Sequence, residues 1–174
     1  DTSRLWYSVC YGNDKFVAVA HDSNYYAYST DGINWTEGTI SDTSRYWMSV
    51  CYGNDKFVTV TDGDLIIAYE YEYAMPEIEN RLIPIMDDNI YTVCYGNDKF
   101  VAVGANGTAA YSIDGNTWTP TTVSTTTQNW YSVCYGNDKF VAISGSFFNT
   151  SQAFAYSTDG INWTEGAISD TARN

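Results

Sequence analysis

The residue types that could carry out chemistry are few in this chain of 174 residues. Its only histidine is His21, which stands beside Asp22, and no Ser–His–Asp or Cys–His group can be assembled around it. One group of closely spaced carboxylates is present, made up of Glu70, Glu72, Glu77, Glu79, Asp87 and Asp88. Pairs of carboxylates hydrolyse glycosides, but alternating Glu and Tyr on a solvent-facing strand gives the same pattern without a reaction. We therefore expect that the chain is not an enzyme and that it holds no cofactor.

The cysteines share one position in a repeated motif, and they are Cys10, Cys51, Cys94 and Cys134. Equivalent residues of neighbouring repeats usually lie beyond the Cα–Cα distance of about 7 Å that a disulfide allows. We therefore expect four free thiols that are buried as small apolar groups. Four Cys ligands could hold a metal only if all pointed at one axis, and no Cys-x-x-Cys pair supports zinc. Residues 62–64 form an acidic turn without the other ligands of a calcium loop, so the sequence predicts no metal.

The elements that position these residues follow from an internal repeat. The octapeptide CYGNDKFV occurs four times, at spacings of 41, 43 and 40 residues. Four units account for essentially the whole chain, with approximate bounds 5–45, 46–88, 89–128 and 129–174. One such unit cannot bury its own apolar faces, so neighbouring units must stack against each other in a single domain or arc that spans residues 1–174.

Each unit reads as four short strands. In the first unit the strands are expected at 6–11, 16–20, 25–29 and 35–40, with turns at Gly-Asn-Asp-Lys and at Asp31-Gly32. No segment shows the periodicity of a helix. Four-stranded units of 40–45 residues are the sequence form of propeller blades. The sequence thus predicts an all-β protein, a β-propeller of four four-stranded antiparallel blades.

Three of the four units also carry the pattern Ser-x-Asp-Gly-x-x-Trp. The matching residues are Ser29, Asp31, Gly32 and Trp35, then Ser112, Asp114, Gly115 and Trp118, then Ser157, Asp159, Gly160 and Trp163. This pattern resembles a one-residue-shorter form of the Asp-box of neuraminidase-type (sialidase-like) β-propellers, Ser-x-Asp-x-Gly-x-Thr-Trp. The resemblance implies a folding element at the turn between the third and fourth strands, away from a catalytic face. We expect Ser and Asp to close the turn and the three Trp side chains to be buried.

The second unit departs from this pattern. Residues 70–72 read Glu-Tyr-Glu in place of Ser-x-Asp, and no Trp follows. Either this is a degenerate blade edge, or it is a specialised contact surface. Sialidase activity is not expected, because a substrate carboxylate needs an arginine cluster and the chain has only Arg4, Arg45, Arg81 and Arg173.

Aromatic residues outside the repeated blocks are the best candidates for ligand binding, and they are Tyr25, Tyr26, Tyr71, Tyr73, Phe147 and Phe148. Flat amphipathic rings suit sugar rings or protein partners, although the same residues also pack ordinary strands. The leading hypothesis is a binding module for a glycan or a surface protein, secreted, on a cell surface or in a phage virion. The alternative is a structural protein that assembles with itself into rings or filaments, and a glycoside hydrolase is less favoured.

Charge and closure complete the sequence-based expectations. The net charge of −13 argues against binding to nucleic acid, and no apolar run reaches the length of a membrane span. A chain without an initiating Met or a signal peptide reads as a mature or excised piece. Four blades either close into a compact ring, which we favour, or form an arc whose exposed faces need further repeats or other copies.

Overall fold

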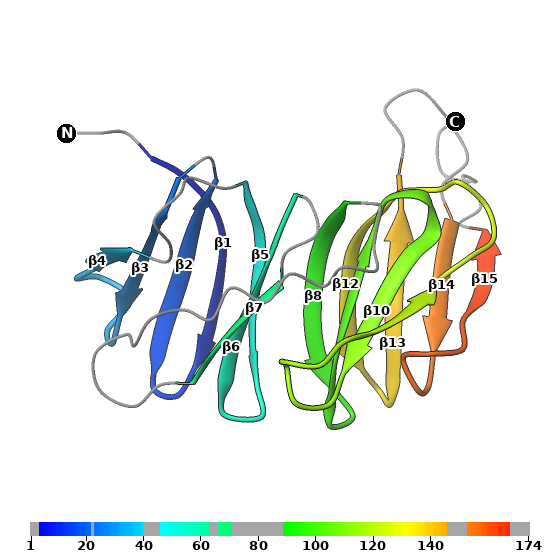
Figure 1. Cartoon of the computed structure of the whole chain (residues 1–174). Coiled ribbons are helices and arrows are strands. Elements are labelled where there is room, and N and C mark those ends of the chain that lie inside the picture. The colour runs from blue at the N-terminus through cyan, green and yellow to red at the C-terminus, as the bar shows by residue number, and fades with distance from the viewer. Residues whose placement is uncertain are drawn as a thin grey trace, which may run out of the picture.

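The computed structural model describes residues 4–21, 23–39, 46–62, 66–70, 89–145 and 153–167, with the backbone alone for 66–70. These residues form fifteen strands in four antiparallel sheets, with one short 3-10 turn (Figure 1). Each sheet pairs its strands in chain order. The prediction of an all-β propeller of four antiparallel blades is confirmed.

The strands of the four blades have the following bounds. The first blade contains β1 (Leu5–Gly12), β2 (Lys15–His21), β3 (Tyr25–Ser29) and β4 (Thr36–Thr39). The second contains β5 (Trp47–Gly53), β6 (Lys56–Thr61) and β7 (Ile66–Glu70). The third contains β8 (Ile90–Gly96), β9 (Lys99–Gly104), the turn η1 (Ala105–Gly107), β10 (Thr108–Ser112) and β11 (Thr119–Thr122). The fourth contains β12 (Trp130–Gly136), β13 (Lys139–Ser144), β14 (Ala153–Ser157) and β15 (Thr164–Ala167).

The repeated Gly-Asn-Asp-Lys segment forms a two-residue hairpin turn in every blade. In the first blade Gly12 pairs with Lys15, and only Asn13 and Asp14 lie in the turn, with φ of 47° and 55°. Two consecutive positive φ values match the tight turn that suits the twist of paired strands, and Asn and Asp tolerate this conformation. The predicted turn is confirmed, and it fixes the register of the first two strands of each blade.

The blades pack side by side through their sheets. Strand β1 packs against β5, β5 against β8, and β8 against β12. Each interface holds its own apolar cluster. Between the first two blades the cluster comprises Val17, Val19, Tyr26, Trp47, Val50 and Phe57. We call the face that a blade turns toward the preceding blade its leading face, and the opposite one its trailing face.

The two outer faces of the blade array are exposed. Trp6 begins the leading face of the first blade and is 43% exposed, whereas its equivalents Trp47 and Trp130 are 0% exposed. On the trailing face of the fourth blade, Ile143 is 46% exposed, whereas the equivalent Val19 is 1% exposed. The described residues therefore form an open arc. The compact four-bladed ring favoured from the sequence is wrong, because the first and fourth blades do not cover each other.

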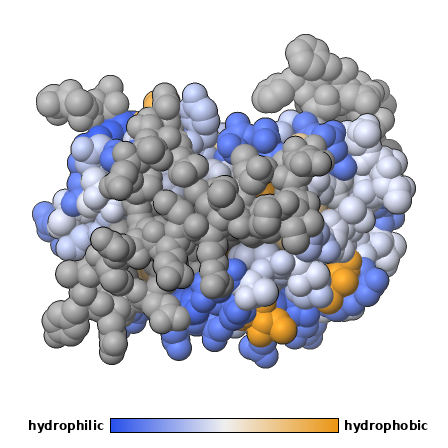
Figure 2. Space-filling view, viewed as in Figure 1, coloured by the Kyte–Doolittle hydropathy of each residue, from blue (hydrophilic) through white to orange (hydrophobic). Residues whose placement is uncertain are grey.

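The broad side of the arc is polar where it is described. Figure 2 shows a mainly hydrophilic surface in this view, with isolated hydrophobic residues near the lower edge. Trp6, Val9 and Tyr11 of β1 and Ile143 of β13 are exposed apolar side chains that instead lie on the end faces described above. Part of the apolar exposure thus results from blade packing that is left incomplete, whereas Ile33 and Ile113 are exposed in the turns between the third and fourth strands.

Candidate binding surface

The first strand of every blade begins with a β-bulge. The pairing of β1 with β2 passes from Trp6 opposite Ala20 to Ser8 opposite Val19, so Tyr7 is an extra residue. The same shift occurs in β5, β8 and β12. The extra residues are Tyr7, Met48, Tyr91 and Tyr131, which we call the bulge row. A bulge re-aims a side chain and is often found beside a binding site.

Sequence reasoning missed the bulge row, although the sequence contained a signal for it. Trp47 and Val50 pack in one interblade cluster, and Ile90 and Val93 pack together in the next. Residues on one face of a regular strand are separated by two or four positions, not by three. A spacing of three between two buried residues therefore requires one extra residue between them.

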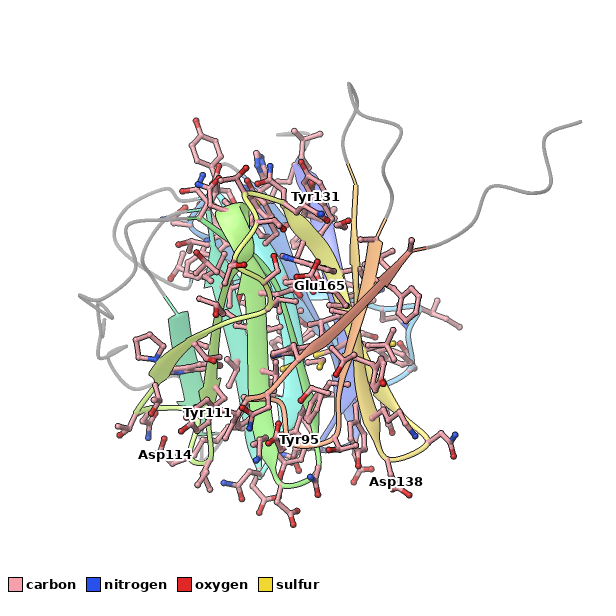
Figure 3. All side chains as sticks on the ribbon, turned by 90° about the vertical axis from the view of Figure 1, so that its right-hand side faces the viewer. Tyr95, Tyr111, Asp114, Tyr131, Asp138 and Glu165 are labelled. Carbon is pink, nitrogen blue, oxygen red and sulfur yellow. The ribbon has the colours of Figure 1, made fainter. Side chains whose placement is uncertain are left out.

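The bulge row lies along one edge of all four blades, which we call the upper rim. Strands β1, β5, β8 and β12 all begin there (Figure 1). In Figure 3, Tyr131 lies at the top of the blades, whereas Asp114 and Asp138 lie at the opposite end. The row thus places one large side chain per blade at the same level of four neighbouring blades.

Rings from the third and fourth blades stack at this rim. The ring centroids of Tyr91 and Tyr131 are 5.1 Å apart, and their planes differ by 12°. The amide Nδ2 of Asn129 donates a hydrogen bond to the hydroxyl of Tyr131 at 3.3 Å. Tyr131 is 44% exposed, so the stack presents an accessible aromatic edge that is held in place by a polar contact.

A second aromatic group bridges the first and second blades. His21 lies between Tyr7 and Tyr46, with ring centroids at 5.1 Å and 4.8 Å. Tyr7 is 57% exposed and Tyr46 is 48% exposed, while His21 is partly buried. His21 is the last residue of β2, which extends one residue beyond the strand expected at 16–20. The only histidine of the sequence therefore stands between two tyrosine rings that are tilted relative to it.

The predicted ligand-binding aromatics occupy different environments. Tyr26 is 8% exposed and packs in the cluster between the first two blades, and Tyr25 is partly buried. Tyr71, Tyr73, Phe147 and Phe148 lie outside the described residues. The ligand-binding role of these six residues stays a prediction. The carboxylate group that begins at Glu70 is also beyond the described side chains.

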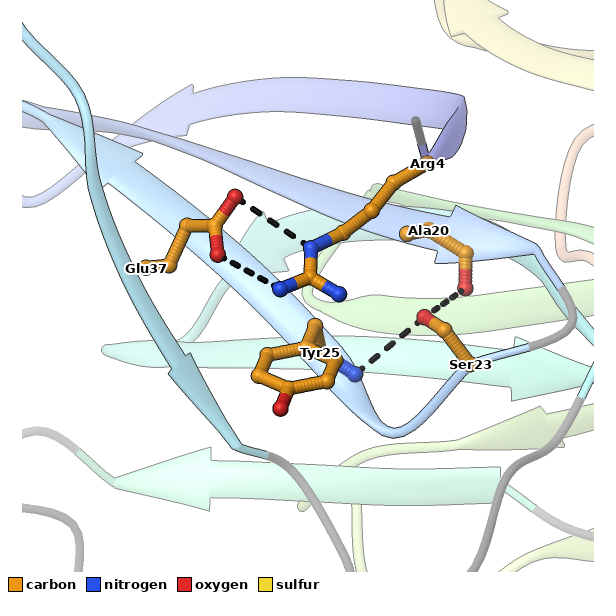
Figure 4. Close-up of polar contacts among 5 residues, drawn as sticks. All are labelled: Arg4, Ala20, Ser23, Tyr25 and Glu37. Atoms are coloured by element: carbon orange, nitrogen blue, oxygen red, sulfur yellow. Dashed lines mark hydrogen bonds and ion pairs between the residues drawn. The ribbon is translucent and has the colours of Figure 1, made fainter. Parts of the chain in front are cut away.

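The ring of Tyr25 is covered on one face by an arginine. The guanidinium carbon of Arg4 lies 3.5 Å from the ring centroid of Tyr25 (Figure 4). Arg4 also donates two hydrogen bonds to the Glu37 carboxylate, at 3.2 Å from Nε and 2.8 Å from the second nitrogen. These bonds lower the pKa of Glu37 and raise the pKa of Arg4. Arg4 is thus engaged within its own blade.

The Ser-x-Asp-Gly turns lie along the opposite edge of the blades, which we call the lower rim. The Oγ of Ser112 donates to Asp114 Oδ1 at 2.9 Å and accepts the Gly115 N–H at 2.8 Å. Asp114 Oδ1 also accepts the N–H groups of Asn116 and Thr117, at 2.8 Å and 2.7 Å. Gly115 has φ of 75°, which glycine adopts without steric cost. Ser and Asp therefore close the turn as expected.

The expectation of buried Trp side chains in these turns holds only where a preceding blade is present. Trp118 is 7% exposed and packs between the second and third blades. Trp163 is partly buried against the cluster between the third and fourth blades. Trp35 is 42% exposed, and the prediction of its burial is wrong, because no blade of the described chain covers the leading face of the first blade.

The four cysteines are free, which confirms the prediction of four thiols without disulfides. Burial raises the pKa of the Cys10 and Cys94 thiols to about 12 and raises that of Cys51 well above its usual value. Cys134 is exposed, contrary to the expectation of four buried thiols, because it lies on the trailing face of the last blade.

The described residues offer neither a metal-binding cluster nor a membrane-spanning helix. In that part of the chain, no group of three or more His, Cys, Asp or Glu side chains is placed to hold a metal ion. Among the same residues, no helix has the length and hydropathy that would let it cross a membrane.

Comparison with solved structures shows a β-propeller fold. An inactive variant of virginiamycin B lyase from Staphylococcus aureus, solved with quinupristin, has a TM-score of 0.78 at 14% identity, and the match covers 97% of this chain and 57% of that one. YCF48 from Cyanidioschyzon merolae gives 0.68 at 13%, covering 98% and 58%. The WD40 β-propeller domain of Doa1 gives 0.68 at 11%, covering 98% and 56%. This chain thus spans just over half the length of these structures.

Another YCF48 structure, bound to D1 peptide, has a TM-score of 0.60 at 14% identity and is matched over 90% of this chain and 50% of that one. No protein-family model matches the sequence, and no curated protein matches it.

The lyase overturns one expectation from the sequence. The prediction that the chain is not an enzyme is contradicted by a structural neighbour that is an enzyme. The absence of a familiar catalytic group from the sequence was therefore not sufficient to exclude activity for a chain of this fold.

Proposed function

We propose that this chain is a propeller binding module that holds an extended segment of a partner protein along its upper rim. The observation that carries the proposal is the bulge row, which sets Tyr7, Met48, Tyr91 and Tyr131 at the same level of four blades. Tyrosine rings bury a large apolar area at low cost in conformational entropy and keep a hydroxyl for hydrogen bonding. Aromatic residues and Met are also enriched in protein interfaces.

Two observations support a protein segment as the ligand. YCF48, a propeller of similar fold, has been solved with a bound peptide. The chain carries a net charge of −13, which favours the approach of a neutral or basic segment over an acidic one. Glycan binding, the other ligand class expected from the sequence, uses the same aromatic surfaces and becomes an outcome of the test. An extracellular, cell-surface or virion location also remains part of the proposal.

A peptide-display selection on the purified chain tests the proposal, followed by affinity measurement on variants. The double variant Tyr91→Ala/Tyr131→Ala removes the stacked pair of the upper rim. We expect the selected peptides to bind it at least about tenfold more weakly, which corresponds to about 1.4 kcal/mol. Ile113→Ala is the control, because Ile113 is 68% exposed on the lower rim.

The result can also reject the proposal. Peptides that bind the double variant as tightly as the unchanged chain would place the ligand elsewhere. Binding restricted to a glycan array, with no selected peptide, would replace the protein segment by a carbohydrate. Thermal unfolding of both variants shows whether the loss of binding reflects a loss of fold.

We further propose that the Ser-x-Asp-Gly-x-x-Trp turns are shortened Asp-boxes. The hydrogen bonds of Ser112 and Asp114 support this assignment, and equivalent bonds occur at Ser29 and Ser157. An insertion variant of the turn tests it: one residue added between Asp114 and Gly115, which restores the longer spacing, should leave stability nearly unchanged. A large loss of stability would separate the two kinds of turn.

A further inference from the structure

Neighbouring blades of this chain join through one repeated contact. Gly12 of the first blade leaves no room for a β-carbon because the ring of Tyr52 from the second blade lies against it. Gly53 meets Tyr95 in the same way, and Gly96 meets Tyr135. In each pair the glycine belongs to the trailing face and the tyrosine to the leading face of the following blade. The contact is therefore a property of the repeat, not of one interface.

The hydrogen bonds across the interfaces repeat as well. Ser8 Oγ accepts the N–H of Val50 at 3.1 Å, and Ser49 Oγ accepts the N–H of Val93 at 3.4 Å. At the lower rim, the Nδ2 atoms of two turn asparagines donate to carbonyl oxygens of the following blade: Asn54 to Ile113, and Asn97 to Thr158, both at 3.2 Å. Lys99 Nζ donates to the carbonyl of Asp159 at 2.8 Å.

Both halves of this contact set are present and open at the ends of the arc. On the fourth blade, Gly136 has no atom within 4 Å of a β-carbon position, and Ser132 and Asn137 are exposed. On the first blade, Tyr11 and Val9 are each 58% exposed. The chain thus carries a free glycine-bearing face and a free tyrosine-bearing face of the same interface type.

We propose that the trailing face of the fourth blade docks onto the leading face of the first blade in a second copy of this chain. Tyr11 of the second copy then packs on Gly136, and the Val9 N–H donates to Ser132 Oγ. Asn137 Nδ2 donates to the carbonyl of Thr30, and Lys139 Nζ donates to that of Asp31. These pairs follow position by position from the three internal interfaces.

Two copies that dock at both ends close into one ring of eight blades. Known propellers contain typically four to eight blades, so eight lies within the range that closes. A contact between different faces of two copies gives a ring when its rotation closes and a filament when it does not. The matched propellers leave a little less than half of their length unfilled by this chain, since it covers 56% to 58% of three of them. A second copy is the partner whose surface already fits, and the proposal is independent of the ligand of the upper rim.

Light scattering on the purified chain, measured as a function of concentration, tests the docking. We expect a dimer at twice the chain mass of 19.5 kDa, which dissociates on dilution. Gly136→Leu should weaken dimerisation by about 10-fold to 100-fold per interface, which is the usual cost of overpacking. It should not disturb the separate chain, because the position is open. Thr127→Leu adds the same side chain at another exposed position and should dimerise normally.

Thiol labelling provides a second readout. Cys134 lies on the docking face, so its labelling rate should fall as protein concentration rises, and Gly136→Leu should abolish this dependence. Tyr11→Ala should weaken the dimer from the opposite face. A chain that stays monomeric at about 100 µM, an assembly larger than two copies, or a dimer that survives Gly136→Leu would each overturn the proposal, with about 100 µM chosen as the scale of a weak specific interface.

Discussion

Tyr52 in the second blade occupies the space that a side chain on Gly12 in the first blade would need. The same pair recurs between Gly53 and Tyr95 and between Gly96 and Tyr135. Gly and Tyr both belong to the repeated octapeptide, so one short motif builds both sides of every blade interface. This explains why the motif is identical in all four blades while the loops between the strands differ.

Substitution of these glycines should therefore reduce stability inside the arc and leave it nearly unchanged at the open end. Gly96→Ala places a methyl group against the ring of Tyr135 and should lower the free energy of unfolding by about 1–3 kcal/mol. Gly136→Ala meets open space and should change it by less than about 0.5 kcal/mol. Urea unfolding at low protein concentration measures both. Equal losses for the two variants would contradict the packing described here.

Two tryptophans that are equivalent in sequence should differ in their contribution to stability. Trp118 is 7% exposed within the cluster between the second and third blades, and truncation to Ala should cost about 3–5 kcal/mol. Trp35 is 42% exposed, and Trp35→Ala should cost less than about 1 kcal/mol. Thermal or urea unfolding of the two variants provides the comparison. A large loss for Trp35→Ala at low concentration would show that its face is covered within the single chain.

The repeat itself was sufficient to predict most of the fold. The period near 42 residues predicts the blades, and the Gly-Asn-Asp-Lys segment predicts the hairpin turns, because both depend on local sequence. Closure could not be predicted in this way. Trp6 and Trp47 occupy equivalent positions of the repeat, yet they are 43% and 0% exposed, because burial depends on whether a blade precedes them.

The candidate surface was harder to predict than the fold. The aromatics chosen for their place outside the repeat include Tyr26, which packs between blades. The bulge row lies three residues before each octapeptide, within the first strand of each blade, where a functional role is easily mistaken for strand packing. Its signal was the three-residue spacing of Trp47 and Val50 on one face, which only the pairing register makes plain.

Thiol reactivity should separate Cys134, on the open trailing face of the fourth blade, from the other three cysteines. Under native conditions at low protein concentration, Cys134 should react first, because it is exposed. Burial raises the pKa of Cys10 and Cys94 to about 12, and that of Cys51 further above its usual value, so few thiolates form there at pH 8. Cys134→Ser should remove the fast phase, and denaturation should release four thiols. Two or more equally fast thiols in the native chain would contradict this order.

The Asp114 turn should make stability depend on acid pH. Partial burial alone would raise the pKa of this carboxyl, but the N–H groups of Thr117 and Asn116 and the hydroxyl of Ser112 outweigh it and lower the pKa to about 2. The usual pKa of Asp is near 4, so the folded state holds the ionised form more favourably than the unfolded state. This contribution is complete above about pH 4 and is lost as the pH falls through about 2.

The variant Asp114→Asn should lack this pH dependence, because its amide does not titrate. At pH 7 we expect it to be less stable than the unchanged chain by about 1 kcal/mol, a modest value because Asp114 is exposed to solvent. The difference between the two proteins should narrow as the pH falls from about 4 toward 2, since the unchanged chain alone loses the charged hydrogen bonds of this turn. Urea midpoints at pH 7, 4 and about 2.5 measure it, a range set by the two pKa values. A difference that stays constant over this range would show that the carboxylate charge at Asp114 does not stabilise the turn.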